Sequence, residues 1–223
     1  MRKDRLIRIA ARALAKAGLV HAYGHCSARV DVDNFPVCPA IPMGQISRDA
    51  PCDLVPVNGP LPPGILGEVR LHQQVYRRYP DAGGVVRFMG PSLMALGSLG
   101  KAPRMRHGFG SYFHPGAGYW NDPQLVRDET RAKGVIDAMG QSTGVIMRGN
   151  GAVVRSSSLE RAVVLAWYLE DAARVELMAL STGLAETAPM LSEQDAKQRA
   201  TDQGGIFERM WDHLTHDDPE KNA

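Results

Sequence analysis

The sequence has few cysteines, no long apolar run and no block of like charge. Its three cysteines, Cys26, Cys38 and Cys52, form no CxxC pair and leave one over, so reduced thiols are expected rather than a disulfide framework. No apolar segment approaches the roughly 18 residues that span a bilayer. Charged residues such as Asp4 and Arg8 interrupt the N-terminal apolar pattern, unlike a secretory signal. The chain is therefore expected to be cytoplasmic and to have no membrane partner.

Charge of either sign is spread along the chain. The 26 basic and 24 acidic residues leave a formal net charge of +2 over 223 residues, without the basic cluster that nucleic-acid binding needs. Nucleic acid is therefore not an expected partner. The hydrophobic fraction of 44% is typical of a globular protein and is sufficient for a sizeable core.

Hydrophobic periodicity predicts both helices and short strands. Apolar residues at helical spacing predict helices over residues 4–17, 65–79, 92–99, 122–139, 159–180 and 193–214, with Asp122 at the start of the fourth. Short apolar runs between turn residues predict strands over 54–57, within 83–91, and over 144–147 and 152–154. Residues 19–32 predict a glycine-containing turn, with His25 and Ser27 in it, that leads into a strand.

The stretch GGVVRFMGP, residues 83–91, carries the chemistry of greatest interest. Alternation along a strand puts Arg87 and Met89 on one face and Phe88 on the other, and Pro91 ends the strand. Arg87 is then either a strand-end charge that extends to water or a charged group placed in a site. The residue types alone do not decide between these readings.

Two further segments hold candidate site residues. Glu68 and His72 lie four residues apart on one face of the helix predicted over 65–79, as in a surface pair or a core histidine with a hydrogen-bonded partner. Residues 103–121 are rich in glycine and aromatic residues and include His107, Tyr112 and His114. Such loops occur in small-molecule sites and also as plain connections.

Several motifs in order resemble the class II aldolase/adducin family. They are GLVHAYGHCSAR, GEVRLHQQVYRRYPDAGGVV, RGNGAVV and SSLERAVVLAWYLEDAARVELMAL, and together they cover most of residues 5–182. The resemblance implies an α/β fold, a three-layer α/β/α sandwich around a mostly antiparallel central sheet. It also implies a domain over residues 1–182, with 183–223 forming a C-terminal helix and charged tail that packs on the same domain or a neighbouring subunit. A homo-oligomer, with a tetramer favoured, is implied as well.

The resemblance fails where the family usually binds zinc. Typical members use an HxH pair at the strand end where this chain has Arg87 and Met89, and a third histidine where it has Asn150. Zinc needs imidazole, thiolate or carboxylate donors, whereas a guanidinium has no lone pair to give and a thioether or amide is a poor substitute. No metal is expected at these positions, and no cofactor is predicted.

The phosphate-binding positions of the family's sugar-phosphate aldolases also differ. Their asparagine is replaced by His25, and their serine pair before the glutamate by Leu66 and Gly67. Decarboxylase-like members are similar to this chain in a GHxSxR version of the first motif, matched here by Gly24, His25, Ser27 and Arg29. The resemblance therefore implies a small unphosphorylated carboxylate as substrate.

The leading hypothesis is a carbon–carbon lyase that acts without the usual zinc site. The resemblance places Glu68, Arg87, Asn150 and His25 at one cleft, with Glu68 as the proton donor and Arg87 binding the anion. Asn150, His25 and Ser27 would bind and orient the substrate, and the loop with His107, Tyr112 and His114 would cover it. The favoured reaction is decarboxylation of a hydroxy-aromatic or ring-cleavage acid, as in aromatic catabolism.

Two alternatives remain open. A lyase with a rebuilt site for a divalent metal would use a new set of histidines drawn from His25, His72, His107 and His114. A non-catalytic, adducin-like binding or assembly module would keep the fold without the chemistry. The glutamate retained at position 68 argues against the second alternative.

Overall fold

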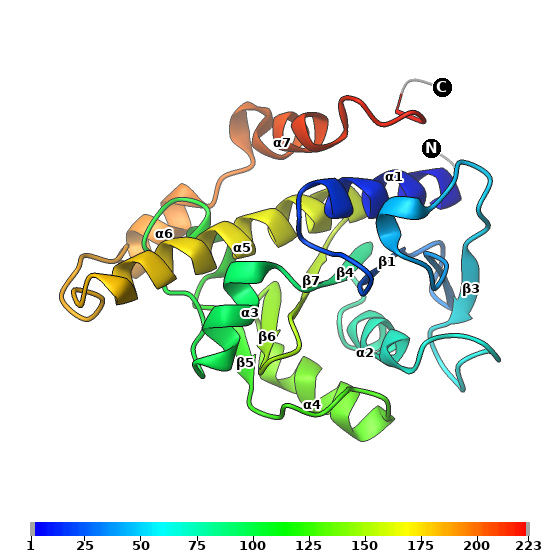
Figure 1. Ribbon diagram of the computed structural model, residues 1–223, viewed down its shortest axis with the longest axis horizontal. Coiled ribbons are helices and arrows are strands. Elements are labelled where there is room, and N and C mark those ends of the chain that lie inside the picture. Colours follow the sequence, from blue (N-terminus) through cyan, green and yellow to red (C-terminus); the bar gives the residue numbers. More distant parts are fainter. Residues whose placement is uncertain (1–2, 222–223) are drawn as a thin grey trace.

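The computed structural model describes residues 3–221, which form seven α-helices and one seven-stranded sheet (Figure 1). The helices are α1 (Lys3–Lys16), α2 (Arg70–Arg78), α3 (Pro91–Ser98), α4 (Glu129–Met139), α5 (Leu159–Ser181), α6 (Glu193–Arg199) and α7 (Ile206–Thr215). The strands are β1 (His25–Ala28), β2 (Asn34–Val37), β3 (Asp53–Pro56), β4 (Gly84–Phe88), β5 (Gly118–Trp120), β6 (Gly144–Met147) and β7 (Ala152–Ser156). Short 3₁₀ turns are η1 (Met43–Gln45), η2 (Gly67–Val69), η3 (Gly110–Phe113) and η4 (Gln203–Gly205).

The sheet is mixed, with mostly antiparallel strands in the order β3-β2-β1-β4-β7-β6-β5. Strand β5 pairs parallel with β6, and every other neighbouring pair is antiparallel. The central strand β4 is the one predicted within residues 83–91. Its Arg87 lies opposite His25 of β1 on one side and Val153 of β7 on the other. The register therefore puts two residues from distant motifs side by side.

Helices cover both faces of the sheet, and alternation along β4 shows which face Arg87 occupies. Val86 and Phe88 belong to a core cluster with residues of α1, α3 and α5, while Val85 belongs to a second cluster with residues of α2 and α4. Figure 1 shows α1, α5 and α7 on one side of the sheet and α2 and α4 on the other. Since side chains two residues apart share a face, Arg87 points towards α2.

The long helix predicted over 159–180 is confirmed as α5, the longest helix of the chain. Its N-terminus is capped by Ser158, whose side chain accepts a hydrogen bond from the Arg161 backbone N–H. Within residues 3–221, no helix combines the length and apolar character needed to cross a bilayer.

The helix predicted from residue 122 begins later than expected. Helix α4 starts at Glu129, with Asp128 rather than Asp122 as the cap, and Asp122 instead accepts a hydrogen bond from the Gln124 backbone N–H. Residues 123–128 are held in an irregular conformation by packing, because Val126 is fully buried and Arg127 lies against Gly67 of η2. Tertiary contacts thus outweigh the local start signal.

Two other expectations need correction. The helix predicted over 193–214 is divided into α6 and α7, because Gly204 and Gly205 adopt φ values of +71° and +63° that interrupt a right-handed helix. His25 and Ser27 lie in strand β1 and not in the preceding turn. The turn ends at Gly24, where a Cβ would approach Val20 Cγ1 to 2.5 Å, and strand β1 begins at the next residue.

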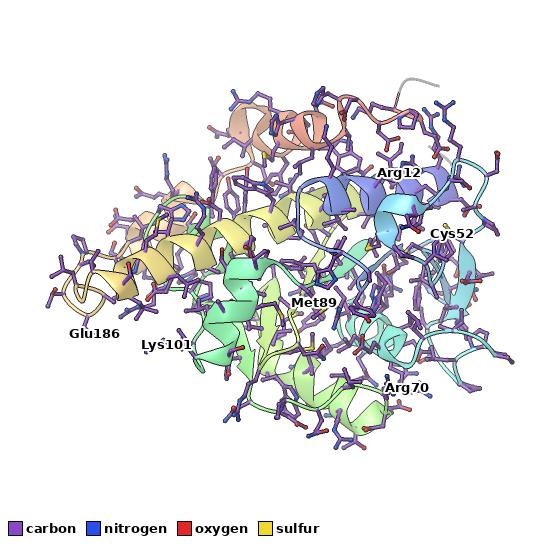
Figure 2. The ribbon with its side chains drawn as sticks, in the orientation of Figure 1. Arg12, Cys52, Arg70, Met89, Lys101 and Glu186 are labelled. Carbon is purple, nitrogen blue, oxygen red and sulfur yellow. The ribbon has the colours of Figure 1, made fainter. Side chains whose placement is uncertain are left out.

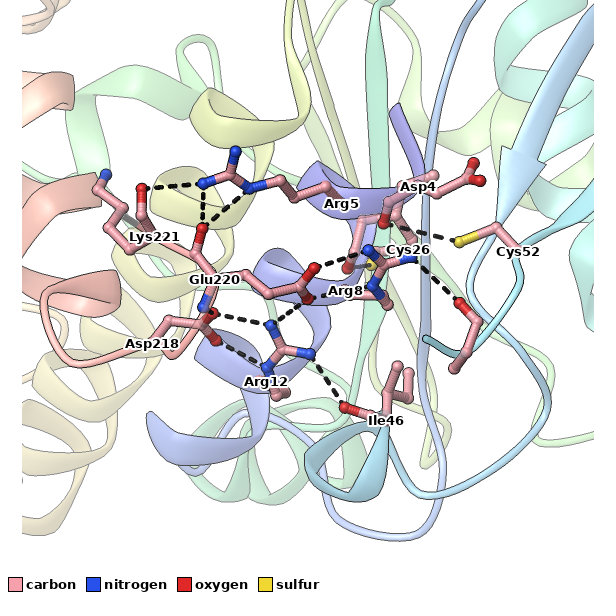
Figure 3. Close-up of polar contacts among 12 residues, drawn as sticks. Asp4, Arg5, Arg8, Arg12, Cys26, Ile46, Cys52, Asp218, Glu220 and Lys221 are labelled. Atoms are coloured by element: carbon pink, nitrogen blue, oxygen red, sulfur yellow. Dashed lines mark hydrogen bonds and ion pairs between the residues drawn. The ribbon is translucent and has the colours of Figure 1, made fainter. Parts of the chain in front are cut away.

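The C-terminal tail packs on α1 through a network of ion pairs (Figure 3). Glu220 accepts from Arg8 at 2.7 and 3.1 Å and from Arg12 at 2.8 Å. Arg12 also binds Asp218 at 2.7 and 2.8 Å. The bidentate contact with Arg8 is the largest reason that the pKa of the Glu220 carboxyl lies below its usual value.

Removing one carboxylate of this network should weaken the fold. We expect Glu220→Gln to lower the free energy of unfolding at pH 7 by about 2 kcal/mol, the usual size of a hydrogen bond to a charged group. Because the folded pKa is lowered, the contribution of Glu220 is complete above the unfolded value of about 4.3. It is lost as the pH falls through the folded value, so the difference from wild type should shrink below about pH 4.

Urea unfolding at pH 7 and at lower pH measures both effects. The control is Asp217→Asn, which removes an exposed carboxylate that pairs with Lys16 and should change stability by less than about 0.5 kcal/mol. Equal stabilities of wild type and Glu220→Gln at pH 7 would show that the Glu220 carboxylate contributes nothing to the stability of the fold.

Candidate active site

Arg87 is a buried cation at the end of the central strand. Its side chain is 2% exposed, and its Nη2 donates to Asn150 Oδ1 at 2.6 Å and lies 3.6 Å from Glu68 Oε2. Among residues 3–221, Arg87 Nε and Nη1 have no hydrogen-bond partner. Burial lowers the pKa of this guanidinium and outweighs the opposing effect of Glu68. Because a buried cation with unused donors is costly, the arrangement is suited to an incoming anion.

Glu68 is the carboxylate of the cluster. It lies in the 3₁₀ turn η2 directly before α2, and its side chain remains 19% exposed. Its Oε2 is 4.0 Å from His25 Nε2 as well as close to Arg87. Glu68 therefore has access both to solvent and to the buried part of the site, as a group that exchanges protons needs.

Asn150 reaches Arg87 from the tight turn between β6 and β7. The turn closes with a hydrogen bond from the Asn150 N–H to the Met147 carbonyl. Gly151 has a φ of +77°, and a Cβ there would lie 2.0 Å from the Phe88 carbonyl oxygen, so only glycine permits this approach to β4. The Asn150 Nδ2 donor has no partner within the described chain.

A buried hydrogen-bonded chain runs from the site into the core. His25 Nδ1 lies 2.6 Å from His72 Nε2, His72 Nδ1 lies 2.5 Å from Ser27 Oγ, and Ser27 Oγ lies 2.9 Å from the Tyr76 hydroxyl. All four residues are at most 2% exposed. At the site end, His25 Nε2 has no hydrogen-bond partner among residues 3–221.

Both histidines of this hydrogen-bonded chain, His25 and His72, are neutral imidazoles. Burial lowers the pKa of His72 to about 3, and the charge of Arg87 acts in the same direction. The pKa of His25 lies well below its usual value, first because of burial and then because of His72 and Arg87. Burial also raises the pKa of the Tyr76 hydroxyl. The hydrogen-bonded chain from His25 to Tyr76 therefore has no net charge near neutral pH, although its side chains carry N–H and O–H groups.

Arg29 holds the inner end of the chain in place. Its Nη2 donates to the Tyr76 carbonyl oxygen at 2.6 Å, its Nε donates to the Ala82 carbonyl oxygen at 2.9 Å, and its guanidinium lies 4.6 Å from the centre of the Tyr76 ring. His25 and Ser27 of the GHxSxR motif thus belong to the hydrogen-bonded chain, and Arg29 of the same motif contacts Tyr76 at its inner end.

The structure brings together five of the candidate residues and separates three. His25, Ser27, Glu68, Arg87 and Asn150 form the cluster described above, at the face of β4 that points to α2. The other three contact C-terminal helices and loops of the same chain: His107 Nε2 lies 3.5 Å from Asp171 Oδ2, the Tyr112 hydroxyl donates to the Thr201 carbonyl, and His114 Nε2 lies 3.8 Å from Glu193 Oε1.

His72 and Tyr76 are members of the hydrogen-bonded chain, a role that helical spacing indicates only in part. Of the two roles considered for His72, a pair with Glu68 or a core histidine with a hydrogen-bonded partner, the second is correct. The part played by the Tyr76 hydroxyl is one that the sequence analysis does not identify. Its signal is the four-residue spacing of Glu68, His72 and Tyr76, which puts all three on one side of the helix predicted over residues 65–79.

The side chains at the family's metal positions do not fit a divalent cation. Arg87 is itself cationic, and it already occupies the side-chain oxygen of Asn150, an amide that is a poor zinc ligand. Met89 is half-buried and contributes only a thioether (Figure 2). The histidines considered for a rebuilt site are not gathered, since His107 and His114 lie against other helices. Residues 3–221 contain no group of three or more histidine, cysteine, aspartate or glutamate side chains able to hold a metal ion.

Residues 5–177 match the family described as Class II Aldolase and Adducin N-terminal domain. A protein named 3,4-dihydroxyphthalate decarboxylase from Rhodococcus jostii (strain RHA1) is 30% identical over 193 residues, which cover 78% of this chain and 79% of that protein. A protein of the same name from Terrabacter sp. (strain DBF63) is 28% identical over 199 residues, covering 81% and 82%.

Solved structures are similar to this chain in fold, although they share little of its sequence. An aldolase II superfamily protein from Pseudomonas syringae has a TM-score of 0.79 at 19% identity and covers 97% of this chain and 93% of its own. An L-fuculose 1-phosphate aldolase from Glaciozyma antarctica PI12 has a TM-score of 0.75 at 18% identity, covering 95% and 89%. At these identities the likeness concerns the fold alone.

Proposed function

The chain belongs to the class II aldolase and adducin family, and from that membership we propose that it is a carbon–carbon lyase that decarboxylates a small, unphosphorylated hydroxy-aromatic acid. The relatives named 3,4-dihydroxyphthalate decarboxylase support this class of substrate. The observation that carries the proposal is the buried Arg87, with Nε and Nη1 unpaired within residues 3–221, beside the carboxylate of Glu68.

The donors of the site favour an anion with several acceptor oxygens. Arg87 Nε and Nη1 point to different sides of the guanidinium and can each donate to a separate acceptor oxygen, and Asn150 Nδ2 can donate to a neighbouring oxygen. The site supplies the charge that a metal supplies elsewhere in the family, but without Lewis-acid coordination. The side chains at the family's usual metal positions do not fit a divalent cation, so the reaction is assigned to Glu68 and Arg87.

Decarboxylation of an aromatic acid replaces one carbon–carbon bond by one carbon–hydrogen bond. We assign to Glu68, in its protonated form, the transfer of a proton to the ring carbon that carries the departing carboxylate. The bond to the carboxyl carbon then breaks, its electron pair restores the aromatic ring, and CO₂ leaves. Glu68 remains as a carboxylate and takes a proton from water, for which its 19% exposure provides access. Each turnover consumes one proton.

Arg87 is best used on a carboxylate that stays with the product. A strong contact to the departing carboxylate would stabilise a charge that is lost in the reaction, and would therefore slow it. A contact to a second carboxylate, or to a phenolate oxygen, orients the ring and draws no charge away from the reacting carbon. The preferred substrate is thus an aromatic acid with a second anionic group beside the first.

We also propose how the protein assembles and what His107, Tyr112 and His114 do. We infer a three-layer α/β/α sandwich from the helices on both faces of the sheet, and a homotetramer from the family. His107, Tyr112 and His114 would then contact a substrate bound in a neighbouring protomer, since their contacts within this chain are with α5, α6 and the segment between α6 and α7. Light scattering of the purified protein measures the assembly.

Turnover of candidate acids tests the proposed function directly. We expect the full chain to release CO₂ from a dihydroxybenzene dicarboxylate, to act much less well on the matching monocarboxylate, and to leave a sugar phosphate unchanged. Elemental analysis of the same sample shows whether any metal accompanies the activity. Retro-aldol cleavage of the sugar phosphate, with no CO₂ released from any of the aromatic acids, would contradict the proposal.

A further inference from the structure

The buried chain from His25 to Tyr76 contains more protons than hydrogen bonds. Each neutral imidazole carries one N–H and each hydroxyl carries one O–H, four protons in all, while the chain has three internal contacts. If every contact holds one proton, the fourth must lie at one of the two ends. It is either on His25 Nε2, which faces the site, or on the Tyr76 hydroxyl and directed away from Ser27.

The two ends differ in what surrounds them. Tyr76 is 2% exposed, lies in a core cluster and packs 4.8 Å from the Phe35 ring. Its hydroxyl is hydrogen-bonded to Ser27 Oγ at 2.9 Å. His25 Nε2, by contrast, faces the carboxylate of Glu68 at 4.0 Å. Each arrangement leaves one buried donor without a hydrogen bond within residues 3–221, and the negative charge of Glu68 favours the N–H of His25 over an O–H of Tyr76 that is turned away from Ser27.

We propose that His72, Ser27 and Tyr76 hold His25 as the neutral tautomer with its proton on Nε2, so that His25 is a fixed hydrogen-bond donor to an anionic oxygen of the substrate. In this arrangement the Tyr76 O–H donates to Ser27, the Ser27 O–H donates to His72 Nδ1, and the His72 Nε2–H donates to His25 Nδ1. The functional part of this inference rests on the proposed function, whereas the tautomer does not.

A fixed donor narrows the class of substrate. Within residues 3–221, the unpaired buried atoms around Glu68 are then all donors: Arg87 Nε and Nη1, Asn150 Nδ2 and His25 Nε2. A substrate with adjacent oxygens that only accept, such as a second carboxylate or a phenolate, satisfies them together. His25 is thereby a specificity-determining group and not a base, and Glu68 alone transfers the proton. His72, Ser27 and Tyr76 are positioning residues.

The tautomer can be measured in the wild-type protein without substrate. Long-range ¹H–¹⁵N correlation spectra of protein labelled with ¹⁵N-histidine distinguish ring nitrogens that carry a proton from those that do not, and His25→Gln and His72→Gln assign the two signals. We expect Nε2–H forms for both histidines, unchanged from pH 8 to pH 5 although His72, Arg87 and Glu68 all face His25. A proton on His25 Nδ1, or an imidazolium in this range, would overturn the proposal.

A matched pair of serine variants tests the chain itself. Ser27→Ala removes the donor to His72 Nδ1, so a mixture of tautomers should appear at His72. Ser111→Ala removes an equally buried hydroxyl that donates to the Gly108 carbonyl, outside the chain, and should leave both signals unchanged. A Ser27→Ala spectrum identical to that of wild type would show that the chain does not set the tautomer.

Activity measurements distinguish a hydrogen-bond donor at His25 from a general base at the same position. His25→Gln retains a neutral N–H donor near the same place and should keep kcat/KM within about fivefold of wild type, with the same pH profile. His25→Leu should lose roughly 10- to 100-fold. A pH transition that is present in wild type and absent from His25→Gln would overturn the assignment. If no acid is turned over, the proposed function fails while the spectra still decide the tautomer.

Discussion

Replacing Glu68 by glutamine is expected to lower kcat by about 10²- to 10⁴-fold, the usual contribution of a positioned general acid. Glutamine keeps the size of the side chain and its contacts with Arg87 and His25, but it has no proton of suitable acidity to give. Assembly, the thermal transition and substrate affinity should change little. The measurement is CO₂ release under saturating acid, with binding followed separately by calorimetry.

The control for this variant is Glu129→Gln. Glu129 also pairs with an arginine, Arg77 at 2.5 Å, but its side chain is 67% exposed and lies at the start of α4. Loss of that carboxylate should leave kcat unchanged. Full activity of Glu68→Gln would remove Glu68 from the mechanism, while equal losses in both variants would point to a general effect of charge.

Arg87→Met is expected to raise KM by about 10- to 100-fold, because it removes charge-assisted hydrogen bonds to the anion. Its effect on stability should be small, because two changes oppose each other. Methionine removes a buried cation that is costly to keep from water, but it also leaves the buried Asn150 Oδ1 without its donor. Arg87→Lys should restore little affinity, since an ammonium lacks the planar, fixed arrangement of donors that a guanidinium presents.

Arg155→Met provides the matched control. Arg155 is another largely buried arginine, 11% exposed, on the neighbouring strand β7, but it contacts Asp81 and the Tyr79 ring instead of the site. Its loss should leave KM unchanged. An Arg87→Met protein with normal KM and reduced stability would return Arg87 to the role of a structural charge.

The parts of the site that follow from periodicity were predictable. The alternation in GGVVRFMGP puts Arg87 on one face of a buried strand, and the resemblance to the family, not periodicity, brings Glu68, Asn150 and His25 near it. The contact of His25 with His72 was not predictable, because it depends on how β1 pairs with β4 and how α2 lies on the sheet. Such contacts join segments far apart in the sequence.

Two misplaced boundaries have a common physical cause. The start of α4 is delayed because Val126 is buried in the second core, and the last helix is broken because Gly204 and Gly205 adopt left-handed conformations. Apolar spacing continues through both places. Periodicity reports which residues face a core, and it does not report whether the backbone between them is helical.

The placement of the two charged groups on β4 and η2 implies that they differ in mobility. Arg87 lies on a strand hydrogen-bonded along both edges, which opens only when much of the sheet does. Glu68 lies in a three-residue turn, and the residue before that turn, Leu66, is exposed. We therefore expect local opening to displace Glu68 more readily than Arg87. Under the proposed mechanism, an anion bound to Arg87 would stay in place while Glu68 exchanges its proton with water.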